Sequence, residues 1–451
     1  MRRDIESELI RWKDDHYRKP LLIRGARQVG KTFSVVSFAK DHFKQHVIVN
    51  LEEHPELIAC FATYEVSDIV AKIEILCQCE LIPGETLLFL DEIQECPRAI
   101  VALRYFYEKM PELHVIGAGS LLEFAFNSPD FRMPVGRISF LYLQPLSFAE
   151  FLDALGHTKL RAYLEKVEPG TGVDGSIHIR LLSILKRYLM IGGMPEVVMA
   201  HASGASTETV KVLQTSINTT YQADFAKYAS TAQHKYLKDV FLSVPRLVGT
   251  RCKFAHINPH VQSRELKGAL ELLGEARCLT RVQHTAAQGL PLAAQSNPRK
   301  FKLIFLDVGL MQRQLGLDAR LLLEENLMMV NNGSVAEQLI GQELLACQHF
   351  TEERQLFFWV RDATSSKAEI DYVASLGPDV FPIEVKAGKT GTLKSLHLFL
   401  QEHPQTPFGI RFSEHELSWH PPLLSIPLYL AGQWRRLAQA VRDILVGADG
   451  E

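Results

Sequence analysis

Short runs of apolar residues alternate with longer helical stretches over roughly the first 150 residues of the chain. The runs have the continuous hydrophobicity of strands that are buried on both faces. They fall at residues 21–23, 46–50, 87–90, 115–117 and 138–143. One of the helical stretches between them covers residues 34–43. This alternation predicts a parallel α/β sheet.

The pattern becomes helical from Phe148 to about Tyr228, with a polar, glycine-containing loop inside it. Pro195 follows Gly192-Gly193-Met194 and is expected to stand at the start of a helix. Residues 230–320 then predict three helices and a short β element, an order typical of a winged helix-turn-helix. Such modules bind DNA or dock proteins, and the sequence leaves both open. Local positive charge is available there from Lys253, Arg264, Lys267, Arg277 and Arg281.

The C-terminal part predicts a second, smaller α/β region. Asn332-Gly333-Ser334 is expected to cap a helix running from Glu337 to Leu345. Three strands are expected after that helix, at residues 357–360, 369–374 and 382–386, and an amphipathic helix at 433–446.

Composition places the chain among ordinary globular proteins. Its 451 residues are 47% hydrophobic and 22% charged, and the net charge is −3. No apolar run approaches the roughly 18 residues that would span a membrane. The seven cysteines form no CxxC pair, which favours reduced thiols in the cytoplasm over a zinc site. Any surface for nucleic acid must be local, because the chain has no overall positive charge.

Residues 25–32 fit the phosphate-binding P-loop pattern GxxxxGK[ST]. They are Gly25, Ala26, Arg27, Gln28, Val29, Gly30, Lys31 and Thr32. The glycines let backbone N–H groups surround the phosphates of ATP, the lysine reaches the β and γ phosphates, and Thr32 coordinates Mg²⁺. The alternative is an ordinary glycine turn between a strand and a helix.

Two acids follow the apolar run 87–90, as in a Walker-B strand. Asp91 is expected to hold Mg²⁺, and Glu92 to polarise the water that attacks the γ-phosphate. The alternative is that one acid caps the next helix. Ser120, after the following strand, is the candidate sensor of the γ-phosphate or of that water, unless it only belongs to a turn. Arg137, after Gly136, is the candidate arginine finger for a neighbouring subunit, unless it is an ordinary salt-bridged residue.

The order of these motifs, followed by Gly192-Gly193-Met194-Pro195-Glu196, resembles the AAA+ superfamily of ATPases. With Tyr221–Phe225, Ala368–Tyr372 and Pro382–Lys386, it is similar to a bacterial and archaeal group in which a domain of unknown function, DUF4143-like, follows the AAA+ module. The resemblance implies four parts. They are an AAA+ core at 1–150, a helical lid at 151–229, a winged helix-turn-helix-like module at 230–325, and a C-terminal domain at 326–451.

The C-terminal strands carry a second set of candidate residues. Glu369 and Asp371 alternate on one strand, and Glu384 and Lys386 on the next, so each pair shares a face. If these strands pair, the set resembles the D…ExK pattern of restriction-endonuclease-like folds, with Glu337 as a possible helical acid. Asp371 and Glu384 would then bind Mg²⁺ and Lys386 would assist hydrolysis of a phosphodiester. We expect them near a polar rim. The alternatives are charges on a half-exposed strand, or a fold that keeps the acids without cutting.

Together these features predict a cytoplasmic ATPase that acts on DNA as a ring, most simply a hexamer, without a membrane partner. It would act as a motor or as an ATP-dependent nuclease. Two other functions stay open. One is an ATP-dependent switch whose C-terminal domain binds a partner protein without catalysis, and the other is a protein remodeller.

Overall fold

The computed structural model describes residues 1–126, 136–317, 333–361, 368–386 and 393–448. They form two compact units. The first comprises Met1–Gln144, Glu275–Arg277 and Gln348–Arg354, and the second comprises Pro145–Gly274, Cys278–Cys347 and Gln355–Glu451. The four-part division is finer than these two units and stays a prediction. No helix in the described residues is long and apolar enough to cross a membrane.

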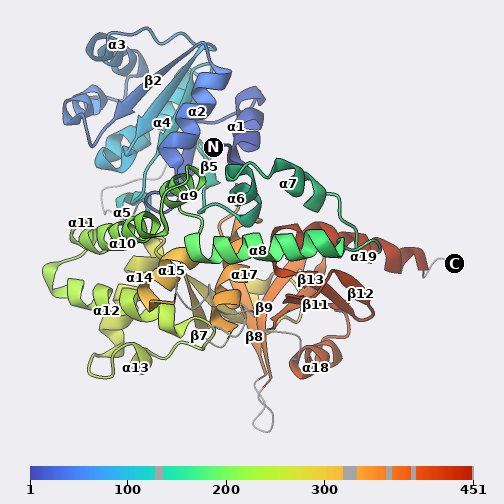
Figure 1. The fold of residues 1–451 in the computed structure, drawn as a ribbon. Coiled ribbons are helices and arrows are strands. Elements are labelled where there is room, and N and C mark those ends of the chain that lie inside the picture. Colours follow the sequence, from blue (N-terminus) through green and yellow to red (C-terminus); the bar gives the residue numbers. More distant parts are fainter. Residues whose placement is uncertain (127–135, 318–332, 362–367, 387–392, 449–451) are drawn as a thin grey trace. The chain divides into compact units, whose positions relative to one another are not determined.

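The first unit is built on a five-stranded parallel sheet in the order β2-β3-β4-β1-β5 (Figure 1). Its strands are β1 Leu21–Arg24, β2 Gln45–Asn50, β3 Thr86–Asp91, β4 His114–Ala118 and β5 Ser139–Tyr142. Each of the five expected strands is therefore present. Because β4 lies between β1 and β3, the loops that follow these three strands meet at one edge of the sheet.

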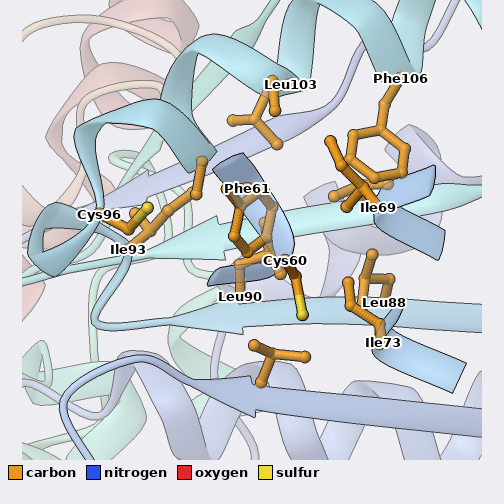
Figure 2. Packing of buried hydrophobic residues seen from close by; sticks show 14 of the residues in the cluster. Cys60, Phe61, Ile69, Ile73, Leu88, Leu90, Ile93, Cys96, Leu103 and Phe106 are labelled. Carbon is orange, nitrogen blue, oxygen red and sulfur yellow. The ribbon is translucent and has the colours of Figure 1, made fainter. Parts of the chain in front are cut away.

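Helices pack on this sheet and bury its apolar residues. They are α1 Ile5–Asp14, α2 Lys31–His42, α3 Val66–Cys77, α4 Pro97–Lys109 and α5 Leu122–Phe126, with short 3-10 turns η1 Pro55–Ala62 and η2 Ile93–Glu95. In one core cluster, Leu88 and Leu90 of β3 pack with Phe61, Ile69 and Phe106 (Figure 2). Strand β3 is buried along its whole length, which explains its uninterrupted hydrophobic run.

His114 gives the first unit a pH-dependent contribution to stability. Its ring lies edge-on to Trp12 and Phe43, and burial lowers its pKa to about 4. In the unfolded chain a histidine has a pKa near 6.5. Between about pH 6.5 and pH 4 the unfolded chain therefore binds a proton at His114 that the folded chain does not bind. The stability of the folded chain falls as the pH drops through this range. We expect this residue to remove about 2 kcal/mol of unfolding free energy between pH 7 and pH 5.

The measurement is urea unfolding of the wild type and His114→Phe at both pH values. Phenylalanine keeps the ring contacts and cannot be protonated. The wild type should lose about 2 kcal/mol more than the variant between the two pH values. An equal loss in both proteins would show that His114 does not titrate on unfolding as argued.

The second unit contains an eight-stranded mixed sheet in the order β12-β13-β11-β10-β9-β8-β6-β7 (Figure 1). Its strands are β6 Leu279–Thr285, β7 Ser296–Phe305, β8 Leu356–Val360, β9 Glu369–Leu376, β10 Asp379–Val385, β11 Gly409–Ser413, β12 Ser418–His420 and β13 Leu423–Pro427. Strands β6 and β7 lie where the sequence predicted the β element of a winged module. They share this sheet with the C-terminal strands, across the boundary expected at residue 325.

The helices of the second unit include those expected for a lid. They are α6 Phe148–Ala154, α7 Thr158–Leu164, α8 Gly175–Ile191, α9 Pro195–Ala202, α10 Thr207–Ala223, α11 Phe225–Tyr228, α12 Thr231–Leu247, α13 Phe254–Ile257, α14 Ser263–Glu275, α15 Val308–Leu315, α17 Ser334–Ala346, α18 Lys394–Glu402 and α19 Trp434–Ala448. Two 3-10 turns, η3 Leu292–Gln295 and η5 Leu428–Gln433, complete the set. Gly333 stands at the start of α17 without a side-chain cap, and Asn332 lies outside the described residues.

The Gly-Gly-Met-Pro turn before α9 is fixed by a buried aspartate. The backbone N–H of Gly193 donates to Asp307 at 2.6 Å. A Cβ on Gly193 would lie 2.2 Å from the carbonyl oxygen of Leu146, so only glycine fits. Pro195 is the first residue of α9, as the sequence predicted. This glycine motif is therefore explained by packing within the second unit.

Candidate functional site

The P-loop connects β1 to α2 in the first unit. Gly30 ends the loop in the left-handed region, with φ of 92°, and α2 begins at the next residue, earlier than the sequence predicted. A Cβ on Gly25 would stand 2.4 Å from the carbonyl oxygen of Leu143. Both glycines are therefore required by backbone geometry, and the N-terminus of α2 opens towards the loop, as an anion site requires.

Lys31 is buried and folds back over the loop. Its ammonium group donates to the carbonyl oxygens of Gly25 at 3.1 Å and Ala26 at 2.8 Å. Burial lowers the pKa of Lys31 to about 8, although the carboxylates of Glu92 and Asp91 oppose that shift. A phosphate at the loop would give this ammonium a charged partner in place of two carbonyls.

Thr32 and Asp91 meet where a P-loop protein holds its metal. The Thr32 hydroxyl donates to Asp91 Oδ2 at 2.8 Å. Burial raises the pKa of Asp91, and the hydrogen bond from Thr32 opposes that rise. A hydroxyl and a carboxylate are hard oxygen ligands, so this pair fits Mg²⁺ that also contacts nucleotide phosphates.

Glu92 and Ser120 lie at the same edge of the sheet. Glu92 has φ of 47°, an uncommon conformation for a non-glycine residue, and its Oε2 accepts a hydrogen bond from Gln94 at 2.7 Å. Ser120 is buried just beyond the end of β4, the strand between those that carry Thr32's loop and Asp91. The role of Ser120 as sensor of the γ-phosphate or of the attacking water stays a prediction, as does the role of Glu92 as general base.

The second set of candidate residues is brought together at the ends of β9 and β10. These strands pair antiparallel as far as Ile383↔Tyr372, so the next residues, Glu384 and Asp371, lie side by side. Asp371 Oδ2 accepts the backbone N–H of Val385 at 2.8 Å, and the Lys386 ammonium donates to Glu384 Oε1. We call Glu337, Glu369, Asp371 and Glu384 the acid cluster.

Lys302 of β7 lies within the acid cluster, and no sequence pattern marks it. Its side chain is 1% exposed, and Nζ lies 2.9 Å from Glu337, 2.7 Å from Glu369 and 3.5 Å from Asp371. Burial alone would lower the pKa of Lys302, but these carboxylates outweigh it and raise the pKa above its ordinary value. The lysine therefore stays charged.

Glu369 and Asp371 share a face, as the sequence predicted, because both contact Lys302, but the alternation along β9 breaks after Asp371. Phe357 pairs with Val373 and Trp359 with Ile370, so two steps along β8 match three along β9. The extra residue is a β-bulge next to Asp371. As a result, Asp371 reaches Lys302 while its neighbour Tyr372 donates its hydroxyl hydrogen to the carbonyl of Glu337 at 2.7 Å.

Burial raises the pKa of two acids of the cluster to about neutral pH. Burial raises the pKa of Glu337 to about 7, opposed chiefly by Lys302. Burial and the charge of Asp371 raise the pKa of Glu384 to about 7, opposed by Lys386. Glu384 is only 4% exposed, so the expected position near a polar rim is wrong for this residue.

The fit of a divalent metal to the acid cluster is restricted. In the ranges that the structure describes, no group of three or more His, Cys, Asp or Glu side chains is arranged to hold a metal. Asp371 and Glu384 remain, and Glu384 Oε2 is buried without a hydrogen-bond donor. Mg²⁺ is commonly held by one or two protein carboxylates, with water and substrate phosphates as its other ligands. Asp371 and Glu384 could provide the two carboxylates.

The P-loop site lies in a region that matches a known domain family. Residues 17–152, which include the P-loop, Asp91, Glu92 and Ser120, match the AAA domain. This part of the chain is therefore an AAA domain. Residues 332–429 match the domain of unknown function DUF4143, which includes all four members of the acid cluster, and residues 182–321 match the domain of unknown function DUF8612. No curated protein matches the chain.

Several solved structures are similar to this chain. Aeropyrum pernix ORC1 in complex with DNA is 16% identical, with a TM-score of 0.31, over 71% of this chain and 95% of its own. Thermotoga maritima RuvB T158V is 15% identical, with a TM-score of 0.29, over 66% of this chain and 90% of its own. C. elegans PCH-2 is 14% identical, with a TM-score of 0.26, over 48% of this chain and 61% of its own. These likenesses carry no information about substrate.

Arg137 lies away from the nucleotide site of its own AAA+ core. It precedes β5, whereas the P-loop follows β1, and these neighbouring strands are parallel. It is therefore at the opposite edge of the sheet. Its side chain is 46% exposed, and its Nε lies 3.1 Å from Glu108 Oε1. A role in hydrolysis would have to be played in another subunit's site. Pro134 and Val135 lie outside the described residues.

Arg277 joins the AAA+ core from a distant part of the chain. Its guanidinium lies 2.7 Å from Glu123, which also binds Arg24, the residue before the P-loop. Arg277 was expected to offer surface charge for DNA, but this partner occupies it. Arg281 is also partly buried, against the Phe301 ring. Only the folded chain shows these contacts, since 154 residues separate Arg277 from Glu123.

Arg411 is a second charged residue beside the acid cluster that the sequence does not predict. It pairs in register with Glu384 on the neighbouring strand β11. Its Nη2 donates to Ser425 at 2.7 Å, and its buried Nε has no acceptor. In the described residues it forms no ion pair, which leaves its charge available for an anion beside Glu384. No sequence motif marks this arginine, because its relevance depends on strand register.

Proposed function

We propose that this AAA+ protein hydrolyses Mg·ATP and uses that energy to act on DNA. The hydrogen bond from Thr32 to Asp91, beside a buried Lys31, supports the ATPase part, because it provides the metal ligands and the phosphate-binding cation in one place. Bound Mg²⁺ would neutralise charge that develops on the phosphates. Lys31 would bind the β and γ phosphates, Glu92 would accept the proton of the attacking water, and Ser120 would contact that water or the γ-phosphate.

We further propose that the acid cluster cleaves a DNA phosphodiester. The side-by-side position of Asp371 and Glu384, with Lys386 on Glu384, supports this proposal. The two acids would hold Mg²⁺, which makes a bound water more acidic. Lys386 would orient or help deprotonate that water. Arg411, on the neighbouring strand β11, would bind the phosphate group of the DNA.

A specific observation favours a second function. Lys302 already neutralises much of the acid cluster, as expected if the DUF4143 domain binds a partner without cutting DNA. The protein would then be an ATP-dependent switch or a protein remodeller. Its ATPase activity would respond to a protein and not to DNA.

ATPase activity with and without duplex, single-stranded and branched DNA tests the DNA proposal. We expect at least one form of DNA to raise kcat severalfold, because a motor hydrolyses ATP faster when its substrate is bound. The Lys31→Ala variant is the control, and it should show no activity with any DNA. Activity that ignores every DNA form would favour the switch or remodeller.

We propose that the active form is a cytoplasmic homo-oligomeric ring, most simply a hexamer, in which Arg137 completes the nucleotide site of its neighbour. Arg137→Ala should then lower kcat by about a thousandfold while ATP affinity stays within a fewfold. Mixing it with Glu92→Gln subunits should restore part of the activity, because some interfaces then join an intact Arg137 to an intact Glu92.

The exposed Arg104, which pairs with the same Glu108, provides the control variant Arg104→Ala. It should retain full ATPase activity. A monodisperse monomer that hydrolyses ATP in light-scattering experiments with Mg·ATP would refute the ring.

A further inference from the structure

Arg3 is a buried arginine whose side chain contacts the P-loop. It stands just before α1 begins, and only 5% of the residue is exposed. Its Nη1 donates to the carbonyl oxygen of Val29 at 2.9 Å, and its Nη2 donates to the carbonyl oxygen of Gln144 at 2.8 Å. One guanidinium therefore joins the P-loop to the segment that follows β5.

The carbonyl group of Val29 precedes the hydrogen-bond ladder of α2. That ladder begins one residue later, where the Gly30 carbonyl accepts the Ser34 N–H at 3.0 Å. Gln28 and Gly30, on either side of Val29, both have positive φ, 61° and 92°. Glycine takes either sign of φ at little cost, so the peptide between Val29 and Gly30 would be free to turn over if no donor held its carbonyl. Arg3 is the buried donor that holds it.

The direction of this carbonyl decides where the next N–H points. The Val29–Gly30 peptide is trans, and the C=O and N–H groups of a trans peptide point in opposite directions. The Val29 carbonyl is turned towards Arg3, so the Gly30 N–H is turned away from it. In a P-loop the backbone N–H groups surround the phosphates. Lys31 donates to two other carbonyls of the loop, and it is the group that would move to a phosphate, so it does not replace Arg3.

We propose that Arg3 is a positioning residue of the nucleotide site, which fixes the Val29–Gly30 peptide so that the Gly30 N–H is available to a phosphate before ATP binds. The proposal rests on the proposed function in taking the P-loop as the ATP site. Arg3 acts through the loop backbone and does not touch the reacting atoms. It therefore contributes to the binding of phosphates and not to the hydrolysis step.

Calorimetric binding of Mg·ATP and of inorganic pyrophosphate to Arg3→Met, in the full chain, tests this proposal. Methionine fills much of the space of the arginine stem and removes both donors. Both affinities should weaken about tenfold or more, as expected when a buried hydrogen bond from a charged group is lost. The kcat at saturating ATP should change by less than about threefold, because the groups that act in hydrolysis are untouched.

Two further variants separate geometry from charge. Arg2→Met is the matched control, because Arg2 stands next to Arg3, carries the same charge and has 77% of its side chain exposed. It should bind both ligands as the wild type does. Arg3→Lys keeps the charge but lacks the two parallel donors of the guanidinium fork. It should bind both ligands more weakly than the wild type and more tightly than Arg3→Met.

The results distinguish failure of this proposal from failure of the ATPase function. A wild type that binds neither ligand would overturn both. If the wild type binds Mg·ATP, then wild-type affinity in Arg3→Met, a loss confined to ATP, or an equal loss in Arg2→Met would overturn this proposal alone. If Arg3→Met does not fold, Arg3→Lys decides the question, because wild-type affinity for both ligands in that folded variant counts against the proposal.

Discussion

Replacing Glu92 with glutamine is expected to leave Mg·ATP binding intact and to slow ATP hydrolysis by about a hundredfold or more. The amide keeps the size of the side chain, which Gln94 contacts at 2.7 Å, but it cannot accept a proton from water. Lys31→Ala should instead abolish binding or weaken it severely, because it removes the buried ammonium of the loop. Affinity for a fluorescent ATP analogue and the rate of phosphate release measure the two effects separately.

Glu95→Gln is the matched control for Glu92. Glu95 is exposed and lies three residues further along the same connection, so it should retain both binding and hydrolysis. An equal loss of binding and hydrolysis in Glu92→Gln would show that Glu92 organises the site and is not its base. The positive φ of Glu92 makes that distinction useful, because strained residues occur in both roles.

Loss of DNA cleavage is the second large effect that we expect. With Mg²⁺ or Mn²⁺, the wild type should nick or cut at least one form of DNA. Asp371→Asn and Lys386→Met should each lower that activity by about a hundredfold or more, because one removes a metal ligand and the other the group that orients water. Gel assays on supercoiled, linear and branched DNA provide the measurement.

The structure determines which substitutions are safe for this experiment. At the polar rim that the sequence predicts, alanine at these positions would cost about 1 kcal/mol or less. Asp371, however, accepts the Val385 N–H and faces the buried Lys302, so alanine there would cost about 1–3 kcal/mol. Asparagine keeps the acceptor.

Asp379→Asn serves as the control. Asp379 lies on β10, the strand of Glu384, but pairs with Arg442, so this variant should retain cleavage. Binding of DNA by a wild type that never cuts would show that the domain is a binding platform.

The P-loop and the acids of the candidate nucleotide site could be located from the sequence because these residues are local. Eight consecutive residues form the P-loop, and Asp91 and Glu92 directly follow a buried strand. The phosphate-binding geometry is a property of that short backbone segment, since Gly25 and Gly30 are the residues that a tight loop and a left-handed turn require. The five strands were also predicted, because continuous apolar runs of that length have few alternatives in a parallel sheet.

What the sequence determined by itself is therefore the parallel sheet of the first unit, the tight turn of the P-loop and the presence of acids on two C-terminal strands. The tertiary structure alone decided which charges meet. Lys302 is 35 residues from Glu337 and 69 from Asp371, and no local pattern links them. The β-bulge beside Asp371 and the register that places Arg411 next to Glu384 depend on strand pairing, which is set by packing of the whole sheet. Charge in a buried cluster is fixed by its nearest neighbours in space, and those neighbours come from distant parts of the chain.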